Sequence, residues 1–428
     1  MSSQSNNSYW NRETIAYFLK LMKLAISDGD VKEILAGEKS GIVDWNELFD
    51  AAVENEVVPM LYKKVEQIYS NSSCISEETF LKWQQEAKGN MFFELPKYTA
   101  IRKVIDAANQ KNIRAVFFKG IILADLYPQY LQRISSDSDI FIEKSDIKKF
   151  EQLLTELGYE KIEASSKEEV QVYKNKQYRH VIEAHTCLWE DYKGPRMQIL
   201  DSLNLTDRSK QVNIKACDID VWTFGHEEHL IYQIFHIVKH FSLNGIGVKY
   251  LSDITLFVNR YISEINVKDF WEKIDKLGYG KFTDYFFYIC QKYLGMTSLI
   301  NADREPEIGP NVLGFVIDLI SVGNISEREA GWQIMGAMEA YFTGEESVPD
   351  SKLRRKLNML FPSAKALPKV YKYAKKYPIL LPFAWIHRDI KFLIKKARQK
   401  NEVYDVTEKI DVAENRMYLI KKLGLTDK

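Results

Sequence analysis

Apolar residues recur at helical spacing near both ends of the chain. Between residues 11 and 95 they follow one another three and four positions apart, without the alternation of apolar and polar residues that is typical of a strand. The same spacing returns from about residue 227, where one face collects Leu230, Ile234, Ile237, Val238 and Phe241. The pattern predicts helices before and after a central segment of different character.

The central segment contains short apolar runs that predict strands. The run at 115–118 is stopped by Lys119 and Gly120, and a short helical stretch follows at 121–126. A second strand is expected at 137–142, since its apolar residues directly follow two acids. The remaining expected elements are a helix from Ile147 to Leu157, ended by Gly158, and extended segments at 169–173 and 178–188.

These elements predict an α+β fold, in which a small core with a mixed sheet is flanked by helical domains. The 428 residues are enough for about three structural units of roughly 150 residues each. The expected divisions are an N-terminal helical domain at 1–95, an α/β core at 96–225, a helical domain at 226–325 and a basic helical region at 326–428.

Composition narrows the class of protein. Lys and Arg number 59, and Asp and Glu also number 59, so the net charge of zero gives no whole-chain argument for nucleic-acid or membrane binding. The N-terminus lacks the basic start and apolar run of a secretory signal, and no window reaches about 18 consecutive apolar residues. The four cysteines are too far apart for a disulfide framework or a zinc–thiolate site. We therefore expect a soluble, cytoplasmic, globular protein without a membrane span.

One segment departs from this balance of charges. Between residues 351 and 400 there are 15 Lys or Arg and a single acid, Asp389, which gives a local net charge of +14. Tyrosines and Trp385 are interleaved with these bases, and such a combination suits single-stranded nucleic acid or an anionic surface. We favour the plainer interpretation, in which a solvated helical face docks against the acidic remainder of the chain.

The most informative polar feature is the pair Asp137 and Asp139 at the start of a predicted strand. Alternate residues of a strand project from one face, so two carboxylates there can hold a divalent cation jointly. A lone pair of this kind is more often a solvent-exposed strand start. Here Ile140-Phe141-Ile142 follows directly, which places the acids on a strand that enters a core.

Two further segments strengthen the interpretation of the aspartates as a metal site. Lys119 and Gly120 lie between a predicted strand and a helix, where backbone amides and a lysine ammonium can approach a phosphate. In a later strand Glu183 and His185 share a face and offer a third carboxylate. Three acids on neighbouring strands beside a Lys-Gly turn are typical of two-metal phosphoryl transfer.

Longer motifs around these residues resemble a known family. The motifs are Phe118-Lys119-Gly120, Leu126-Tyr127-Pro128, Arg133-x-Ser135-Ser136-Asp137-Ser138-Asp139-Ile140 and Ile182-Glu183-Ala184-His185. In combination they resemble the poorly characterised bacterial nucleotidyltransferases of the polymerase β-like superfamily. The resemblance includes the stretches Asp44–Tyr62 and His236–Asp253 and therefore spans roughly residues 40 to 300.

The resemblance implies a polymerase β-like core and a role for each site residue. Asp137 and Asp139 would be metal ligands, with Mg²⁺ or Mn²⁺ as the cofactor. Glu183 would be the third carboxylate, either as a further ligand or as the base that activates an acceptor hydroxyl. The triphosphate of an NTP substrate would be held by Lys119, Gly120, Arg133 and Ser136.

The sequence departs from the superfamily pattern at two places. Lys119-Gly120 stands where the superfamily usually has Gly-Ser, so the standard phosphate-loop geometry does not transfer directly. Ser138, rather than an aliphatic residue, separates the two aspartates. The second departure leaves open a catalytically degenerate, nucleotide-binding module that recruits RNA or a protein partner through the basic C-terminal region.

A pair of histidines, His236 and His240, stands one helical turn apart, which is the spacing of a zinc pair. Ile237 follows His236, so the glutamate of the H-E-x-x-H motif is missing and we do not favour zinc. The candidates to contact the acceptor or to support the site are His185, His236, Lys239, His240 and Asp253.

The sequence thus predicts a metal-dependent nucleotidyltransferase that moves a nucleoside monophosphate from an NTP to an acceptor. The acceptor and the preferred base of the NTP stay open at this point. The degenerate binding module is the alternative, and use of the same pocket by a phosphotransferase is a weaker one.

Overall fold

The computed structural model describes most of the chain. The described residues are 12–35, 43–163, 169–189, 196–243, 245–299, 351–364 and 371–398, with shorter pieces at 304, 315–316, 319, 349, 366–367 and 417–425. The predicted basic region 326–428 therefore lies partly outside the described residues.

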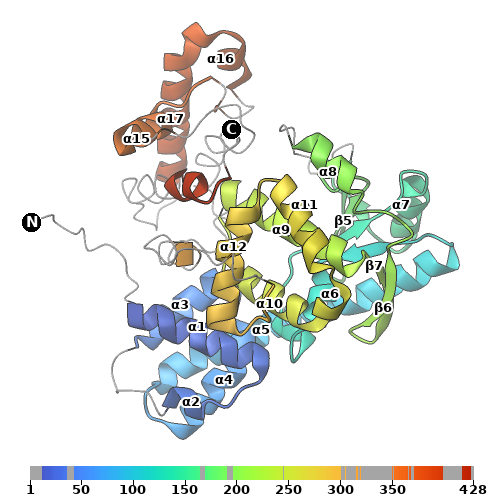
Figure 1. Cartoon of the computed structure of the whole chain (residues 1–428), viewed down its shortest axis with the longest axis vertical. Helices are drawn as coiled ribbons and strands as arrows, with labels where there is room; N and C mark the ends of the chain where they lie inside the picture. Colours follow the sequence, from blue (N-terminus) through green and yellow to red (C-terminus); the bar gives the residue numbers. More distant parts are fainter. Residues whose placement is uncertain are drawn as a thin grey trace, which may run out of the picture.

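The α/β core is built on a mixed sheet of seven strands within the described residues. The strands are β1 (Val116–Phe118), β2 (Ser138–Phe141), β3 (Glu160–Lys161), β4 (Val170–Asn175), β5 (His180–His185), β6 (Val212–Ala216) and β7 (Ile219–Thr223). Their order across the sheet is β3-β4-β5-β2-β1-β7-β6. β2 is parallel to β5 and β1 is parallel to β7, whereas the other neighbours are antiparallel. The sheet therefore places β1, β2 and β5 side by side (Figure 1).

Apolar side chains cover both faces of this sheet. Phe117 and Ile140 belong to a buried cluster that also contains Phe150 of α7 (Ile147–Glu156). Phe118 and Phe141 point to the opposite face, where their rings lie 5.2 and 6.0 Å from that of Phe224. Successive residues of a strand alternate between faces, so the sequence position of each residue selects its layer. Asp139 shares the face of Phe118 and Phe141.

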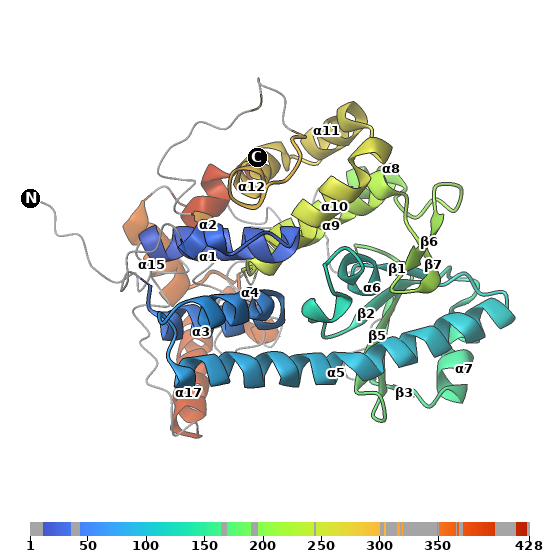
Figure 2. The same ribbon diagram turned by 90° about the horizontal axis from the view of Figure 1, so that it is seen from below.

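The N-terminal helical segment leads directly into the core. Its helices are α1 (Arg12–Ser27), α2 (Lys32–Leu35), α3 (Trp45–Glu54), α4 (Val58–Asn71) and α5 (Glu77–Gln110). Asp44 caps α3 by accepting hydrogen bonds from two backbone N–H groups of its first turn. Figure 2 shows α5 running beneath α3 and α4 and onward along the sheet. This 34-residue helix passes through the predicted division at residue 95, so one continuous helix joins the segment to the core.

A second group of helices follows the sheet. It comprises α9 (His226–Leu243), α10 (Lys249–Tyr261), α11 (Val267–Lys276) and α12 (Gly280–Ile289), while shorter α6 (Gly120–Ala124) and α8 (Met197–Leu203) lie within the core segment. Helix α10 contacts both α9 and α1. Phe18 of α1 and Leu251 of α10 therefore belong to one buried cluster. The helices before and after the sheet share a core, which fixes α9 and α10 beside the strands.

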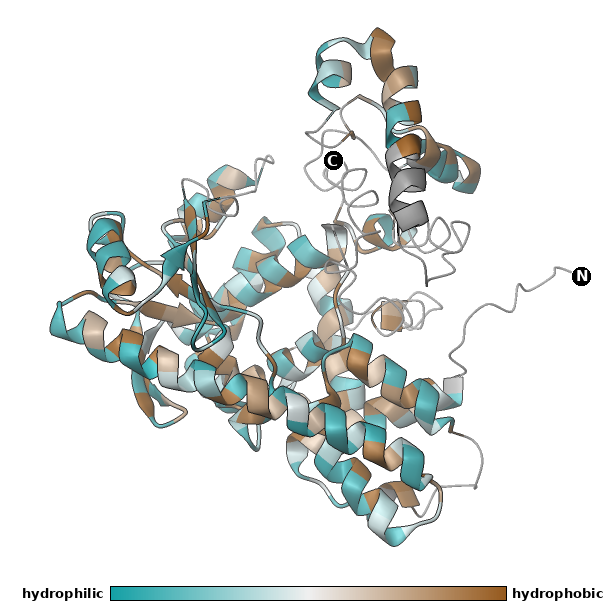
Figure 3. Cartoon of the chain, turned by 180° about the vertical axis from the view of Figure 1, so that it is seen from behind, coloured by the Kyte–Doolittle hydropathy of each residue, from teal (hydrophilic) through white to brown (hydrophobic). Residues whose placement is uncertain are grey.

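The described residues between 351 and 398 of the basic region form a small group at the top of Figure 1, whereas Met417 and Leu425, further along the region, belong to the main buried cluster. The helices of this group are α15 (Lys352–Leu360), α16 (Lys372–Lys376) and α17 (Leu381–Arg398). They enclose a separate small core that includes Tyr371 and Ala384. Hydrophobic residues along α17 are visible in Figure 3, and Phe383 and Ile386 among them are exposed. Within the described residues, no helix is both long and apolar enough to cross a bilayer.

The structure confirms the predicted α+β fold class with flanking helices. The predicted strands at 115–118 and 137–142 correspond to β1 and β2, the extended segment at 169–173 covers the first part of β4, and the segment at 178–188 contains β5. The hairpin of β6 and β7 was not predicted from the sequence. Its turn consists of Cys217 and Asp218, both with positive φ (49° and 61°), and Cys-Asp is not among the dipeptides that signal such a turn.

Candidate active site

Strand register brings the predicted site residues together. In the pairing of β2 with β5, Asp139 lies directly opposite Glu183. In the pairing of β1 with β2, Asp139 lies opposite Phe118, the last residue of β1. Lys119 and Gly120 follow Phe118 directly, so the turn after β1 ends beside the acids of the two neighbouring strands.

Three side chains from these strands form a compact donor group. Asp139, Glu183 and His185 each offer one atom, and these atoms lie within 4.8 Å of one another. The Nε2 atom of His185 is 3.1 Å from a carboxylate oxygen of Asp139 and 3.6 Å from one of Glu183. Asp139 and His185 are buried, whereas the Glu183 side chain is 35% exposed. The group therefore opens to solvent on the side of Glu183.

Lys119 has an unusual backbone and a buried ion pair. Its φ is +65°, a value that few residues other than glycine adopt, and its backbone N–H donates to Nε2 of His229 over 3.3 Å. Its ammonium lies 2.9 Å from a carboxylate oxygen of Asp139. Burial by itself lowers the pKa of Lys119, but Asp139 and Tyr232 outweigh this effect and raise it. Lys119 is therefore a fixed positive charge in the site.

The acids differ in how strongly the site favours their charged form. Burial raises the pKa of Asp139, but Lys119 and His185 outweigh burial and hold it at about 2. Burial and the neighbouring Asp139 raise the pKa of Asp137, and the same two causes raise that of Glu183 to about 7. One acid is thus firmly ionised, and two others experience its negative charge.

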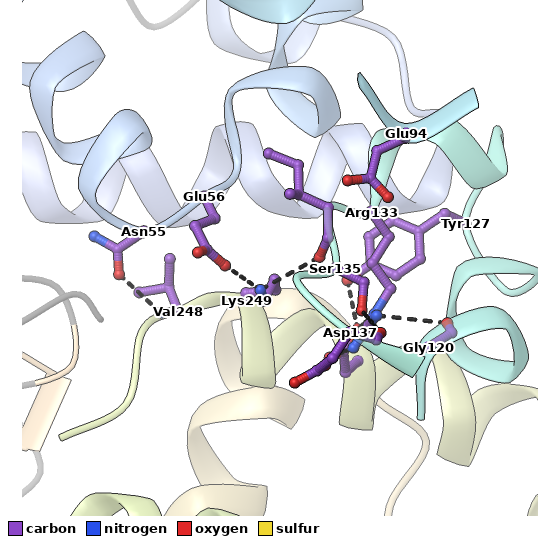
Figure 4. Close-up of polar contacts among 12 residues, drawn as sticks. Asn55, Glu56, Glu94, Gly120, Tyr127, Arg133, Ser135, Asp137, Val248 and Lys249 are labelled. Carbon is purple, nitrogen blue, oxygen red and sulfur yellow. Dashed lines mark hydrogen bonds and ion pairs between the residues drawn. The ribbon is translucent and has the colours of Figure 1, made fainter. Parts of the chain in front are cut away.

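Arg133 and Asp253 form a buried pair beside this group. The guanidinium donates from Nε to Oδ1 over 2.7 Å and from Nη2 to Oδ2 over 2.9 Å, while Tyr127 donates to Oδ1 over 2.8 Å. The third guanidinium nitrogen, Nη1, reaches the carbonyl of Gly120 over 3.5 Å. Figure 4 shows Arg133, Tyr127 and Gly120 next to Asp137. Arg133 therefore contacts the turn that carries Lys119 and Gly120, and its role in holding a triphosphate stays a prediction.

Ser138 belongs to the opposite face of β2. Its hydroxyl and the Nε2 atom of His180 are 2.8 Å apart, and the Nδ1 atom of His180 is 2.7 Å from the hydroxyl of Tyr159. All three residues are buried. Ser138 therefore has a hydrogen-bond partner in the core. Because it lies on the face of β2 opposite Asp139, a serine in place of an aliphatic residue does not disturb the acids. The predicted phosphate contact Ser136 lies just outside, with an exposed side chain.

The remaining predicted candidates lie on α9. The rings of His236 and His240 are 4.3 Å apart, and that of His236 lies 5.9 Å from Tyr232 and 6.1 Å from Tyr250. Burial lowers the pKa of His236, and the charge of Lys119 lowers it further. His236 is therefore close enough to the site for the charge of Lys119 to act on it. Lys239 is half-buried on the same helix.

Two residues near the site were missed by sequence reasoning. Lys249, the first residue of α10, contacts the carbonyl of Ile134 in the loop before the two aspartates, and its spacing of four residues from Asp253 places both on one face of the helix. That spacing was the available signal. His229 supports Lys119 from α9, and its spacing of seven residues from His236 was the corresponding signal.

Comparison with known proteins identifies the protein as a nucleotidyltransferase. Residues 42–295, more than half of the chain, match the family described as uncharacterised nucleotidyltransferase. The chain belongs to this family. No curated protein matches it.

Solved structures with a similar fold are distant. A crystal structure of ANT(2")-Ia in complex with adenylyl-2"-tobramycin is 11% identical, with 42% of this chain and 95% of that chain covered at a TM-score of 0.31. A solution structure of ANT(2'')-Ia is 13% identical. The match covers 42% of this chain and 87% of that chain, with a TM-score of 0.30. A crystal structure of an antigenic nucleotidyltransferase-like protein from Paracoccidioides brasiliensis is 15% identical. The match covers 38% of this chain and 76% of that chain, with a TM-score of 0.27.

Proposed function

We propose that the protein is a metal-dependent nucleotidyltransferase that transfers a nucleoside monophosphate from an NTP to an acceptor still to be identified. In this reaction an acceptor oxygen attacks the α-phosphorus, and the bond to the oxygen that bridges to the β-phosphate breaks. Pyrophosphate leaves, and the proton of the acceptor passes to a base. Membership of the family supports the transfer, and the site supports the requirement for a metal.

The observation that carries the proposal is the convergence of Asp139, Glu183 and His185 on two adjacent strands. Burying Asp139 next to the partly buried Glu183 is unfavourable unless cations or hydrogen bonds compensate. A fold that needed only a stable core would place apolar residues there. The arrangement is therefore better explained by binding of a cation and a phosphate than by stability.

The donors suit Mg²⁺ or Mn²⁺. Both cations favour oxygen ligands, which Asp139 and Glu183 would supply from facing positions. Asp137, which directly precedes β2 and is not part of the compact donor group, would be the third acid ligand. His185 is hydrogen-bonded to Asp139 and so orients that carboxylate. When bound, such cations would neutralise charge on the triphosphate and activate the attacking oxygen.

The other residues act on the phosphates and on the acceptor. The ammonium of Lys119, held at Asp139, offers a compact charge to any phosphate bound beside that carboxylate. Gly120 is tied to Arg133, which keeps the turn that carries Lys119 in place. Glu183, which is more exposed than Asp139, would serve either as a further ligand or as the base that takes the acceptor's proton.

A pyrophosphate-release assay tests the proposal. The purified protein is given each of the four NTPs with Mg²⁺ or Mn²⁺, and a cell extract supplies acceptors. We expect release that EDTA abolishes and that is absent in Asp139→Asn. Asp220→Asn is the matched control, because Asp220 is exposed on β7, away from the site strands β2 and β5. Release that persists in Asp139→Asn would refute the metal assignment.

The degenerate binding module has one observation in its favour. Both carboxylate oxygens of Asp139 already have partners, Lys119 and His185. If these partners exclude a cation, the pocket binds nucleotide without turnover. Calorimetric NTP binding that is unchanged by EDTA, without pyrophosphate release under any condition above, would favour this module.

A further inference from the structure

Lys249 links the N-terminal helices to the loop that precedes the two aspartates. Its ammonium pairs with Glu56, in the turn between α3 and α4, and donates to the carbonyl of Ile134 over 3.4 Å (Figure 4). Its side chain is 13% exposed. Burying a charged lysine is costly, so its position beside the predicted phosphate site suggests a role in binding.

The charge of Lys249 acts on the site itself. The ammonium of Lys249 contacts the carbonyl of Ile134, three residues before Asp137, and the charges of Lys119 and Lys249 both lower the pKa of Asp137. Because Lys119 comes from the turn after β1 and Lys249 from α10, they approach Asp137 from different elements. A bound triphosphate carries several negative charges, and cations on two sides can hold it in one orientation.

The partners of these cations differ in how easily they can be exchanged. Arg133 is held by both oxygens of Asp253, and Lys119 is held by Asp139, and these two carboxylates are only 2% and 4% exposed. Breaking either pair would leave a buried charge without a partner, which is costly. The Glu56 carboxylate is 25% exposed, so water can solvate it once Lys249 has left. Lys249 is therefore the cation of this group that can change partner at low cost.

The backbone under Lys249 is fixed, although its side chain can change partner. The side chain of Asn55 accepts a hydrogen bond from the N–H of Val248 over 2.9 Å. The same oxygen would lie 2.9 Å from a Cβ atom at position 247, so glycine is required there for this close approach. The start of α10 is thus held against the turn after α3, so an exchange of partner by Lys249 requires only its side chain to move.

We propose that Lys249 binds the triphosphate of the incoming NTP beside Asp137, exchanging Glu56 for phosphate oxygens. This inference rests on the proposed function and deepens it. Glu56 then competes with the nucleotide for Lys249, so the N-terminal helices set the affinity of the site through one carboxylate. The two substitutions of this pair have opposite effects on nucleotide affinity, which distinguishes the proposal from a purely structural salt bridge.

Isothermal titration calorimetry with Mg²⁺-tripolyphosphate and with each Mg²⁺-NTP tests the exchange. We expect Lys249→Met to weaken binding about tenfold or more, and Glu56→Gln to tighten it several-fold. In the double variant the gain from Glu56→Gln should vanish, because no lysine is left to be released. Asp50→Asn, an exposed acid on α3, is the matched control and should bind like the wild type.

Several outcomes would overturn the inference. If Glu56→Gln weakens binding, or if both variants lower the melting temperature without changing affinity, the pair is structural. If Lys119→Ala weakens nucleotide binding and Lys249→Met does not, only this inference fails. If the wild type binds neither tripolyphosphate nor any NTP, the proposed function fails and this inference fails with it.

Discussion

The ammonium of Lys119 lies 2.9 Å from a carboxylate oxygen of Asp139, across two neighbouring strands. Without a bound cation, this lysine supplies the positive charge that the buried aspartate requires. The two aspartates of the motif are therefore not equivalent, since Asp139 has strong cationic partners and Asp137 mainly experiences burial and the charge of Asp139.

The first prediction separates these two aspartates. We expect Asp139→Asn and Asp137→Asn both to abolish transfer. In the absence of metal, Asp139→Asn should lower the free energy of unfolding by on the order of 3 kcal/mol, because it leaves Lys119 buried without its charge partner. Asp137→Asn should leave stability unchanged or raise it, because it removes a repelled charge. Urea unfolding in EDTA measures both, and equal destabilisation by the two variants would contradict this account.

The second prediction concerns the rate of transfer. Lys119→Ala should slow the reaction by about 10²–10³-fold and weaken NTP binding, since a positioned charge on the transferring phosphate is lost. Lys119→Arg should rescue only part of the rate, because a planar guanidinium replaces a compact ammonium. Steady-state kinetics and nucleotide titration measure these effects. Identical titrations for the wild type and Lys119→Ala would remove Lys119 from the site.

The third prediction concerns Arg133 and Asp253, which form a bidentate buried pair. Arg133→Met and Asp253→Asn should each lower the free energy of unfolding by about 3–5 kcal/mol, because each leaves one buried charge without a partner. The double variant should be less destabilised than the sum of the two, since no isolated charge remains. A double-mutant cycle by urea unfolding measures the coupling, and strict additivity would show that the pair does not interact energetically.

The fourth prediction concerns pH and His180. Burial lowers the pKa of His180 to about 3, from an ordinary value of 6.5. The unfolded chain therefore binds a proton at His180 more readily than the folded protein does. The free energy of unfolding keeps its full value above pH 6.5 and decreases as the pH falls from 6.5 toward 3, by up to about 1.4 kcal/mol per pH unit.

His180→Gln serves as the comparison for this pH effect, since it keeps a polar side chain beside Ser138 but cannot titrate. Urea unfolding at pH 7, 6 and 5 should show a smaller loss of stability for the variant than for the wild type. His229, whose pKa burial also lowers to about 3, contributes equally to both proteins and cancels in the difference. Parallel pH profiles for the two proteins would show that His180 is not the cause.

The fifth prediction concerns the basic region, whose docking against an acidic surface stays a prediction. Lys375 and Lys376 are exposed on α16, so reversing their charge to Glu tests polyanion binding without disturbing a core. We expect no affinity of the wild type for single-stranded RNA at about 0.15 M salt. RNA recruitment would be favoured by two results together. The wild type would bind RNA with an affinity whose logarithm falls linearly with the logarithm of salt concentration, by about 0.7 per phosphate contacted, and the charge-reversed variant would lose this binding.

Much of the candidate site follows from local sequence. The alternation of strand residues predicted that Glu183 and His185 share a face, and the apolar run after Asp139 predicted a strand that enters a core. Both inferences depend only on neighbouring residues, because the period of a strand is a property of the backbone. The helical spacing that predicted α9 rests on the same kind of local rule.

Only the tertiary structure decided which of these segments meet. The parallel pairing of β2 with β5 sets Asp139 opposite Glu183, and the partner of Arg133 lies 120 residues further along the chain. Glu56 and Lys249 are 193 residues apart, and the turn and helix that carry them meet because the helices on either side of the sheet share one core. Periodicity specifies the face of an element on which a residue lies. The neighbour of that face depends on long-range packing of apolar surface, which is non-directional and leaves no local pattern in the sequence.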